Sequence, residues 1–349
     1  MAAQPIPAGT QVFTERPIVV APGGTVGVAK AVLKLDRAGE CFEAVCQLQS
    51  RADRSVEGWG PWAAGLAAVN CHGAGGTLLD PSAGRRTVIG LLGSMMAHEC
   101  CPSAVTHFSS AADGTLLSLY TVRALEPGEL LSISYCAMYQ TAAERRTLLQ
   151  KQHGFMCVCR RCVDSPEHVR AFRCPACGEG PCSPIDSGPA CRRLECDSCG
   201  AEMELDDEAW GDLEAAEKSE TVSGEMLEVL HPYHHVPTAM YKNNIHRLPP
   251  GSRAAFFRQH GDARQRIYDA FCAAELAHPL VANDIESAAV AHLSGGELDL
   301  AGEAFREAAG MFASFYGQGS VDARRCHEAA GAATLDEYKE LNGEVHAHQ

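Results

Sequence analysis

No stretch of this 349-residue chain contains the roughly 18 consecutive apolar residues that a membrane-spanning helix requires. The first residues, MAAQPIPAG, also lack a basic segment followed by an apolar one, so we expect no secretory signal. The composition is 46% apolar and 21% charged, which excludes wholesale disorder. We therefore expect a globular protein of the cytoplasm, the nucleus or both, without a membrane partner.

Basic residues and cysteines are both scarce in the second part of the chain. Residues 201–349 contain 26 acidic residues against 11 lysines and arginines, which gives −15, whereas residues 1–200 contain 18 of each. Of the 17 cysteines, 15 lie in the first 200 residues. Phosphate neutralisation needs a basic surface, so we do not expect direct nucleic-acid binding by the chain as a whole. The length allows two domains, and the composition shift predicts a neutral, cysteine-rich front and an acidic back.

The front predicts an α+β fold. Three short β-rich runs are bounded by proline and glycine, at 11–22, 116–122 and 130–135. A short helix is expected over 142–152, where Thr141 and Glu144 have the spacing of a capping box. Residues 157–200 are expected to be loops dense in cysteine.

The back predicts an all-α region. The candidate helices are 206–230, 251–276, 282–294, 297–316 and 320–341. Small residues recur every three to four positions after residue 295, which suits closely packed helix pairs of the tetratricopeptide kind.

Four cysteines form two Cys-x-x-Cys pairs with 18 residues between them. They are Cys174, Cys177, Cys196 and Cys199. Zinc takes four thiolates in a tetrahedron, and Gly178 and Gly200 permit the sharp turn after each pair, so we expect a zinc ribbon. The alternatives are disulfides, which a chain without a secretory signal rarely forms, or unrelated buried thiols. Cys182 and Cys191 lie between the pairs and could serve as alternate ligands.

A second cluster offers three thiolates, Cys157, Cys159 and Cys162. Three ligands alone would leave an open position on a metal. Alternatively, a distant residue closes the site, and Cys100 or Cys101 are the obvious donors.

Three stretches, in this order, resemble the SET domain of protein methyltransferases, and in particular its SMYD branch. They are IPAGTQVFTERP (6–17), GSMMAHECCPS (93–103) and RALEPGELLSISY (123–135). A helix containing Arg145, Arg146 and Leu149 follows, and then FMCVCRRC (155–162), which resembles the post-SET signature. The resemblance covers about residues 5–163, and the combination of motifs is more specific than any one of them.

The resemblance implies a protein-lysine methyltransferase that uses S-adenosylmethionine and binds a lysine-bearing protein or peptide. The segment after His98 would thread beside the strand of Tyr135 as a pseudoknot, and the Tyr135 hydroxyl would lie at the point of methyl transfer. The implied cofactor-binding residues are Asn70, Ser94, Met96, Ala97, His98 and Phe155. Cys100 would complete the zinc site of the other three post-SET cysteines, giving two zinc ions in the chain.

The implied organisation has four parts. Residues 1–152 would form the SET domain, residues 153–165 the post-SET zinc segment, residues 170–202 the zinc ribbon and residues 203–349 a helical, tetratricopeptide-like domain. Taken without the motifs, Tyr135 would be an ordinary strand tyrosine, His98 a core histidine and Phe155 a core aromatic residue.

The sequence departs from the family pattern at several points. The family asparagine before His98 is Ala97, and a lost buried hydrogen bond commonly costs about 1–3 kcal/mol. The family asparagine after Pro102 is Ser103, and His153 replaces a tyrosine found in many relatives. We expect the first Gly-x-Gly cofactor loop to be missing, because the chain starts at MAAQPIPAG. The MYND zinc finger is also expected to be absent, since Cys41, Cys46, Cys71 and His72 do not make its ligand set.

Two other functions fit some of these features. Ala97 and the missing loop suit a catalytically silent SET scaffold that binds partners through its acidic helical region. Four arginines near the ribbon suit a nucleic-acid-binding zinc ribbon, which we rank lowest; they are Arg170, Arg173, Arg192 and Arg193. The acidic region itself either attracts a basic peptide or is a solvated face.

Overall fold

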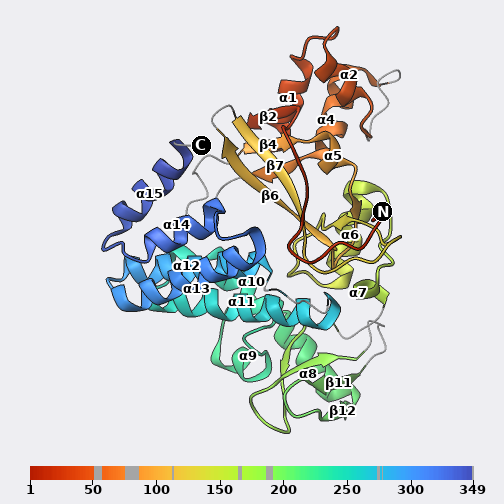
Figure 1. Cartoon of the computed structure of the whole chain (residues 1–349). Coiled ribbons are helices and arrows are strands. Elements are labelled where there is room, and N and C mark those ends of the chain that lie inside the picture. The colour runs from red at the N-terminus through yellow and green to blue at the C-terminus, as the bar shows by residue number, and fades with distance from the viewer. Residues whose placement is uncertain are drawn as a thin grey trace.

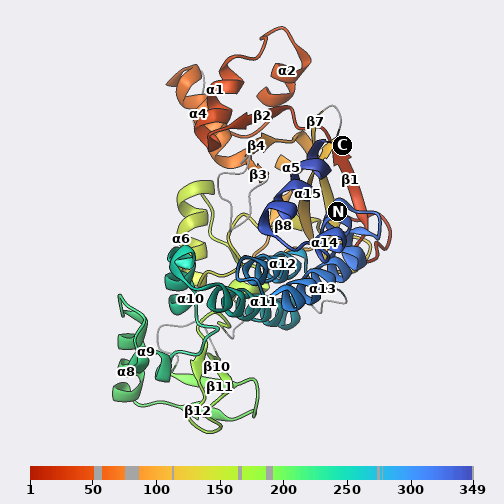
Figure 2. The same cartoon turned by 90° about the vertical axis from the view of Figure 1, so that its left-hand side faces the viewer.

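The computed structural model describes residues 1–50, 57–74, 86–111, 114–163, 167–185, 192–272, 276 and 278–347. Figure 1 shows the helices of residues 24–70 at one end of the molecule. The short strands that carry the two Cys-x-x-Cys pairs lie at the other end, together with the two helices that follow them up to residue 229. Figure 2 shows the same order after a quarter turn, with small sheets and a layer of long helices between the two ends. The mixed α+β class predicted from the sequence is confirmed.

The described residues before the post-SET-like cysteines form three small sheets. The first is antiparallel in the order β1 (Gln11–Glu15), β7 (Gly114–Thr121), β6 (Ala104–Ala111). The second has the order β2 (Val19–Pro22), β4 (Arg86–Ile89), β3 (His72–Ala74), and the third pairs β5 (Ala97–His98) with β8 (Ser132–Ile133). The run predicted over 11–22 is therefore two strands in different sheets. Pro17 lies at the break, where it lacks the N–H that a ladder needs.

Helices between these strands were not predicted. They are α1 (Gly24–Leu33), α2 (Glu40–Cys46), α4 (Trp59–Asn70) and the single turn α5 (Leu91–Ser94). Glycines within α1 and α4 lower their intrinsic helix propensity, and a shared core overrides it. That core includes Val28, Val32, Val45 and Leu66, all of them inaccessible to solvent.

The cysteine-rich segment is more ordered than the predicted loops. Helix α6 (Ala142–His153) begins with the predicted capping box of Thr141 and Glu144, which is confirmed. After α7 (Arg160–Val163) come four antiparallel strands in the order β12-β11-β10-β9. They are β9 (Phe172–Arg173), β10 (Pro181–Pro184), β11 (Arg193–Cys196) and β12 (Glu202–Glu204). Cys191 and the other residues at 186–191 lie outside the described residues.

The back is helical, as predicted, with more breaks than the periodicity suggests. Its helices are α8 (Asp207–Glu217), α9 (Gly224–Val229), α10 (His235–Asn243), η1 (Ile245–Arg247), α11 (Pro250–Cys272), α12 (Pro279–Ser294), α13 (Leu298–Tyr316), α14 (Val321–Ala329) and α15 (Leu335–Ala347). The single helices predicted over 206–230 and 320–341 were wrong, because Ser223 caps a new helix and Gly331 lies in the turn after α14. Helix α10 was not predicted. Within the described residues, no helix is both long enough and apolar enough to cross a membrane.

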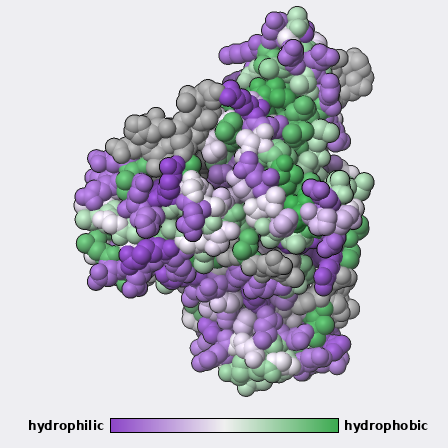
Figure 3. Space-filling model, viewed as in Figure 1, coloured by the Kyte–Doolittle hydropathy of each residue, from purple (hydrophilic) through white to green (hydrophobic). Residues whose placement is uncertain are grey.

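The long helices pack in sequence, α11 on α12, α12 on α13 and α13 on α14. Alanines such as Ala304 and Ala308 let them approach closely, and Phe305 and Phe312 fill the space between them. Figure 3 shows hydrophilic colour over the visible face of these helices, whereas hydrophobic colour gathers over the end formed by residues 24–70. Val26 is 63% exposed at that end.

The helical layer is joined to the first sheet by aromatic and charged side chains. His107 of β6 contacts the Asp322 carboxylate of α14 at 2.6 Å, and its ring centroid lies 4.3 Å from that of Tyr316. The Tyr120 ring of β7 meets Tyr316 edge-on at 4.7 Å. The front and the back therefore form one continuous body at this junction.

Arg325 lies behind this junction between two carboxylates. It donates to Asp322 at 2.7 Å and to both oxygens of Glu286, at 2.9 and 2.7 Å. Arg325→Met would leave two largely buried carboxylates without their cation, so we expect a loss of about 3–5 kcal/mol in the free energy of unfolding, measured in urea. Lys339→Met is the control, because it breaks an exposed ion pair with Asp336. It should change the free energy of unfolding by less than about 1 kcal/mol. Equal effects of the two variants would contradict this reading of Arg325.

Candidate active site and metal centres

Two short strands bring distant parts of the front together. Strand β5 pairs in parallel with β8, which places His98 opposite Ile133. The next residue extends the pairing, because the Glu99 N–H donates to the Ile133 carbonyl at 3.1 Å and the Glu99 carboxylate accepts the Ser132 hydroxyl at 2.6 Å. This β5–β8 pairing, called here the β5–β8 crossing, therefore fixes His98 beside the segment that contains Tyr135.

His98 links Tyr135 to the post-SET-like cysteines. Its Nδ1 accepts the Tyr135 backbone N–H at 2.9 Å, and its Nε2 lies 3.3 Å from Cys100 Sγ. Burial lowers the pKa of His98 to about 4, so the ring is neutral at pH 7. Since Nδ1 accepts, the proton of the neutral ring is on Nε2 and points at the sulfur. One imidazole thus sets the position of both groups.

The Tyr135 hydroxyl is also fixed. It donates to the Met96 carbonyl, which lies directly before β5. Burial raises the pKa of Tyr135, so the phenol keeps its proton at neutral pH. The hydroxyl oxygen can then accept a hydrogen bond or face a developing positive charge, but it does not act as a phenolate base.

Tyr135 belongs to a cluster of four aromatic rings with His98, His153 and Phe155. The Tyr135 ring centroid lies 5.1 Å from His98 and 4.7 Å from His153, and Phe155 lies 5.9 Å from His98. Tyr135, His153 and Phe155 are all half-buried, so the cluster presents aromatic surface to solvent. Such a surface suits a planar base and a cationic sulfonium or ammonium group.

The remaining predicted cofactor residues lie on the turn before β5 and next to it. Ser94 donates its hydroxyl to the Asn70 carbonyl at 3.0 Å. Both hydrogens of the Asn70 side-chain amide are used, on the carbonyls of Gln49 and Leu66, at 2.6 and 2.8 Å. A ligand contact from this side chain would have to come from Oδ1. Ala97 offers no side-chain donor.

Cys100, Cys157, Cys159 and Cys162 form a compact group in which every sulfur lies within 4.8 Å of the others. Four thiolates at about 2.3 Å from a zinc ion would be about 3.8 Å apart. The sulfur of Cys100 lies 3.8 Å from that of Cys157 and 3.5 Å from that of Cys162. The group fits a closed, four-coordinate zinc site, with Cys100 rather than Cys101 as the fourth donor.

Two buried arginines lie against this group, which the sequence did not indicate. Arg145 is inaccessible to solvent and donates to Cys162 Sγ at 3.7 Å and to the Arg161 carbonyl at 3.2 Å. Arg161 is 5% exposed and donates to the Cys100 carbonyl at 3.1 Å. One carboxylate, Glu167, lies 3.8 Å from Arg145 and balances one of the two cations. A zinc ion with four thiolates carries a charge of −2, so the metal-bound group would supply the further negative charge that four neutral thiols lack.

The ribbon cysteines form a second such group, again within 4.8 Å of one another. The Cys174–Cys199 and Cys177–Cys196 sulfurs are 3.8 and 3.9 Å apart, close to the tetrahedral edge. Burial favours the neutral thiol of Cys174, but hydrogen bonds from backbone N–H groups and from the neighbouring thiols of Cys177 and Cys196 together lower its pKa to about 6. Cys182 is buried beside the group and is not one of its four members.

A third group of metal-ligating side chains, also missed from the sequence, contains Glu217, His234 and His235. Glu217 is already occupied by Arg170, whose Nε and Nη2 donate to it at 2.7 and 2.8 Å. His234 Nδ1 accepts the Val236 N–H, so its Nε2 carries the proton donated to Glu217 at 3.0 Å. With the arginine in place this group is an ion-pair network rather than a metal site.

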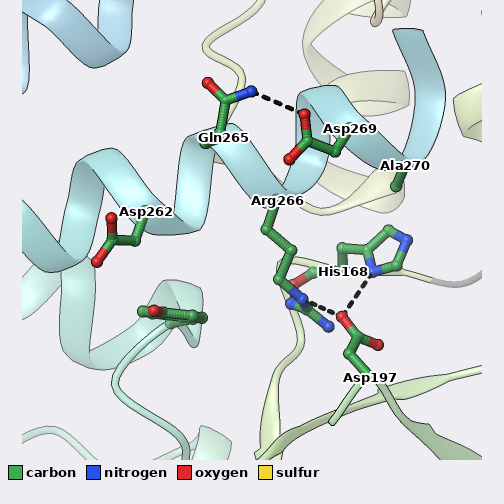
Figure 4. A pocket seen from close by; sticks show the side chains of 8 residues that line it. His168, Asp197, Asp262, Gln265, Arg266, Asp269 and Ala270 are labelled. Carbon is green, nitrogen blue, oxygen red and sulfur yellow. Dashed lines mark hydrogen bonds and ion pairs between the residues drawn. The ribbon is translucent and has the colours of Figure 1, made fainter. Parts of the chain in front are cut away.

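An open hollow of about 470 Å³ lies between α11 and the ribbon (Figure 4). Arg266 crosses it from α11 to the Asp197 carboxylate, and it also donates to the His168 carbonyl at 2.9 Å and to the Ser183 hydroxyl at 2.8 Å. None of the cofactor-site residues predicted from the sequence lines the hollow. Arg266 therefore clamps the ribbon to the helical layer, away from Tyr135.

Comparison with curated proteins finds relatives over part of the chain. It is 32% identical over 74 residues to a SET and MYND domain-containing protein of Dictyostelium discoideum, covering 21% of each. It is 24% identical over 166 residues to histone-lysine N-methyltransferase set5 of Schizosaccharomyces pombe, covering 47% of each. It is 41% identical over 69 residues to histone-lysine N-methyltransferase SMYD3 of Mus musculus, covering 20% of this chain and 15% of that protein.

The match spans less than half the length of each of these relatives. No protein-family model matches the chain.

Proposed function

We propose that this chain, which belongs to the SET-domain lysine methyltransferase family, is an S-adenosylmethionine-dependent protein-lysine N-methyltransferase. The observation that carries the proposal is the placement of His98, whose Nδ1 accepts the backbone N–H of Tyr135 just after β8 and whose Nε2 faces Cys100. A tyrosine hydroxyl, an aromatic surface and a candidate zinc centre are thereby connected within one small site. The substrate would be a lysine side chain of a protein or peptide, histone or not.

S-adenosylmethionine supplies an activated methyl group when bound. The residues proposed to hold it are Asn70, Ser94, Met96, Ala97, His98 and Phe155, with Phe155 and the neighbouring rings against the planar base. The protein's own contribution is alignment and exclusion of water. The Tyr135 hydroxyl donates to the Met96 carbonyl, which orients its oxygen. That oxygen would then contact the reacting groups and hold them in position.

The lysine must be neutral to attack a methyl group, and its ordinary pKa is about 10.4. A narrow apolar channel lowers that pKa because desolvation penalises the ammonium. His98 and the phenol of Tyr135 are uncharged at neutral pH, so neither adds an anion that would favour the charged lysine. His153 contributes a ring to the same wall, where the family has a tyrosine.

We also propose that the chain is organised in four parts. The β5–β8 crossing would be the pseudoknot of a SET domain over residues 1–152, and residues 153–165 would be fastened by the first zinc ion. Residues 170–202 would be a zinc ribbon, and residues 203–349 a tetratricopeptide-like domain whose acidic groups attract a basic substrate. We expect the protein to act in the cytoplasm, the nucleus or both.

A silent scaffold is the second candidate, and two observations favour it. Ala97 provides no side-chain contact for a cofactor, and both amide hydrogens of Asn70 are engaged by backbone carbonyls. In that case the chain would bind protein partners through its acidic helices.

Transfer of labelled methyl groups distinguishes the two. The zinc-loaded full chain would be incubated with tritiated S-adenosylmethionine and a mixed protein extract, and proteins would be separated and counted. The enzyme predicts labelled bands that depend on the chain, with N-methyl-lysine after hydrolysis. Absence of label, together with no cofactor binding by the zinc-loaded chain, would favour the scaffold, whereas micromolar cofactor binding would argue against it.

A further inference from the structure

The turn that leads into the proposed site is held by a side chain from another sheet. Glu15 is the last residue of β1, and its carboxylate accepts the backbone N–H of Leu92 at 3.0 Å and that of Gly93 at 2.7 Å. Both belong to α5, which has no capping side chain of its own. A single carboxylate therefore satisfies two amides that the one-turn helix leaves without an internal partner.

Two glycines make this contact possible. A Cβ at Gly90 would lie 2.3 Å from Glu15 Oε1, and one at Gly93 would lie 3.3 Å from it. Leu117, paired with Glu15 across the β1–β7 ladder, would also contact both added atoms, at 3.3 and 3.2 Å. Gly90 has an extended backbone with a φ of −100°, so glycine is needed there for space rather than for backbone conformation.

A short chain of hydrogen bonds leads from Glu15 to the tyrosine. The Gly93 N–H donates to Glu15, and the Gly93 carbonyl accepts the Met96 N–H at 3.3 Å. The Met96 carbonyl in turn accepts the Tyr135 hydroxyl. Ser94, inside the same turn, is fixed to the Asn70 carbonyl at 3.0 Å.

Resting on the proposed function, we infer that Glu15 is a positioning residue for the methyl-transfer site. It holds the turn that presents Ser94 and Met96, and through the Met96 carbonyl it holds the Tyr135 hydroxyl. It does not touch the reacting groups itself. A glutamine at this position keeps the length but has only one acceptor oxygen, so its NH₂ group would face one of the two backbone N–H donors.

The test is calorimetric titration of the zinc-loaded full chain with S-adenosylmethionine. We expect Glu15→Gln to raise the cofactor Kd about tenfold, on the scale of one lost hydrogen bond to a charged group, and to lower kcat as well. Glu15→Asp, which keeps both acceptors, should recover part of the affinity. Hydrogen exchange at the Leu92 and Gly93 amides should become faster in Glu15→Gln.

Two further variants keep the test decisive. Gly90→Ala displaces the carboxylate by its Cβ without changing Glu15 and should raise the Kd similarly. Asp206→Asn is the matched control, because it alters a carboxylate that accepts a backbone N–H, from Ala209 at 2.9 Å, at the start of the distant α8. Unchanged cofactor Kd in both Glu15→Gln and Gly90→Ala would overturn the inference and leave the proposed function standing, whereas no binding by the unaltered chain would overturn both.

Discussion

Tyr135→Phe should lower kcat for lysine methylation by about 10²–10³-fold, the range seen when one preorganised polar group at a reaction centre is removed. The variant removes only the hydroxyl, whose donated bond to the Met96 carbonyl orients its oxygen. The ring contacts with His98 and His153 stay in place. The cofactor Kd should therefore change little, and the loss should appear in kcat.

The control for this variant is Tyr120→Phe. Tyr120 lies in β7, away from the proposed site, and its hydroxyl donates to Gln11 Oε1 of the neighbouring strand β1 at 2.7 Å. Removing that exposed bond should leave kcat within about twofold, since a net hydrogen bond is worth only about 1 kcal/mol to stability. If Tyr135→Phe and Tyr120→Phe methylate at equal rates, Tyr135 is not the residue at the methyl-transfer point.

The second large effect is expected from the zinc site of Cys100. Cys100→Ser removes the ligand that joins the front of the chain to the three later cysteines, so one of two zinc ions should be lost. Arg145 and Arg161 would then lie buried beside a group with less negative charge. We expect the free energy of unfolding to fall by about 3–5 kcal/mol and the thermal unfolding midpoint to fall by roughly 10 °C or more. Methyl transfer should be lost as well.

Metal analysis and activity together separate the two sites. The unaltered chain should contain two zinc ions per molecule, and Cys100→Ser and Cys177→Ser should each contain one. Cys177→Ser removes the ribbon ion, and methyl transfer should persist because no ribbon residue lies in the aromatic cluster. Cys41→Ser changes an exposed thiol and should retain both ions. Two zinc ions in Cys100→Ser would contradict the assignment of Cys100 as a ligand.

The sequence was most informative where chemistry depends on spacing. The ribbon group follows from the two Cys-x-x-Cys pairs because each pair supplies two thiolates from one turn. The inclusion of Cys100 with the later cysteines did not follow from spacing, which left Cys101 equally open, and depended on the resemblance. The capping box at Thr141 was recognisable because its two partners are three residues apart.

Features that depend on contacts between distant segments could not be predicted. Glu15 contacts a turn more than seventy residues later, and nothing in its neighbourhood marks it as a cap. Arg145 and Arg161 look like surface arginines in a basic segment, yet both are buried against the cysteines. Helices α1 and α4 contain glycines that weaken a local helical pattern, and they form because Val28, Val32 and Leu66 share a core.

The most direct test of the account is a calorimetric titration of the zinc-loaded, unaltered chain with S-adenosylmethionine. A site formed by Ser94, Met96, His98, Tyr135 and Phe155 predicts one molecule bound per chain with a Kd in the micromolar range. Competition by S-adenosylhomocysteine should abolish the heat. Absence of binding at millimolar cofactor, with both zinc ions present, would contradict the proposal that this site transfers a methyl group.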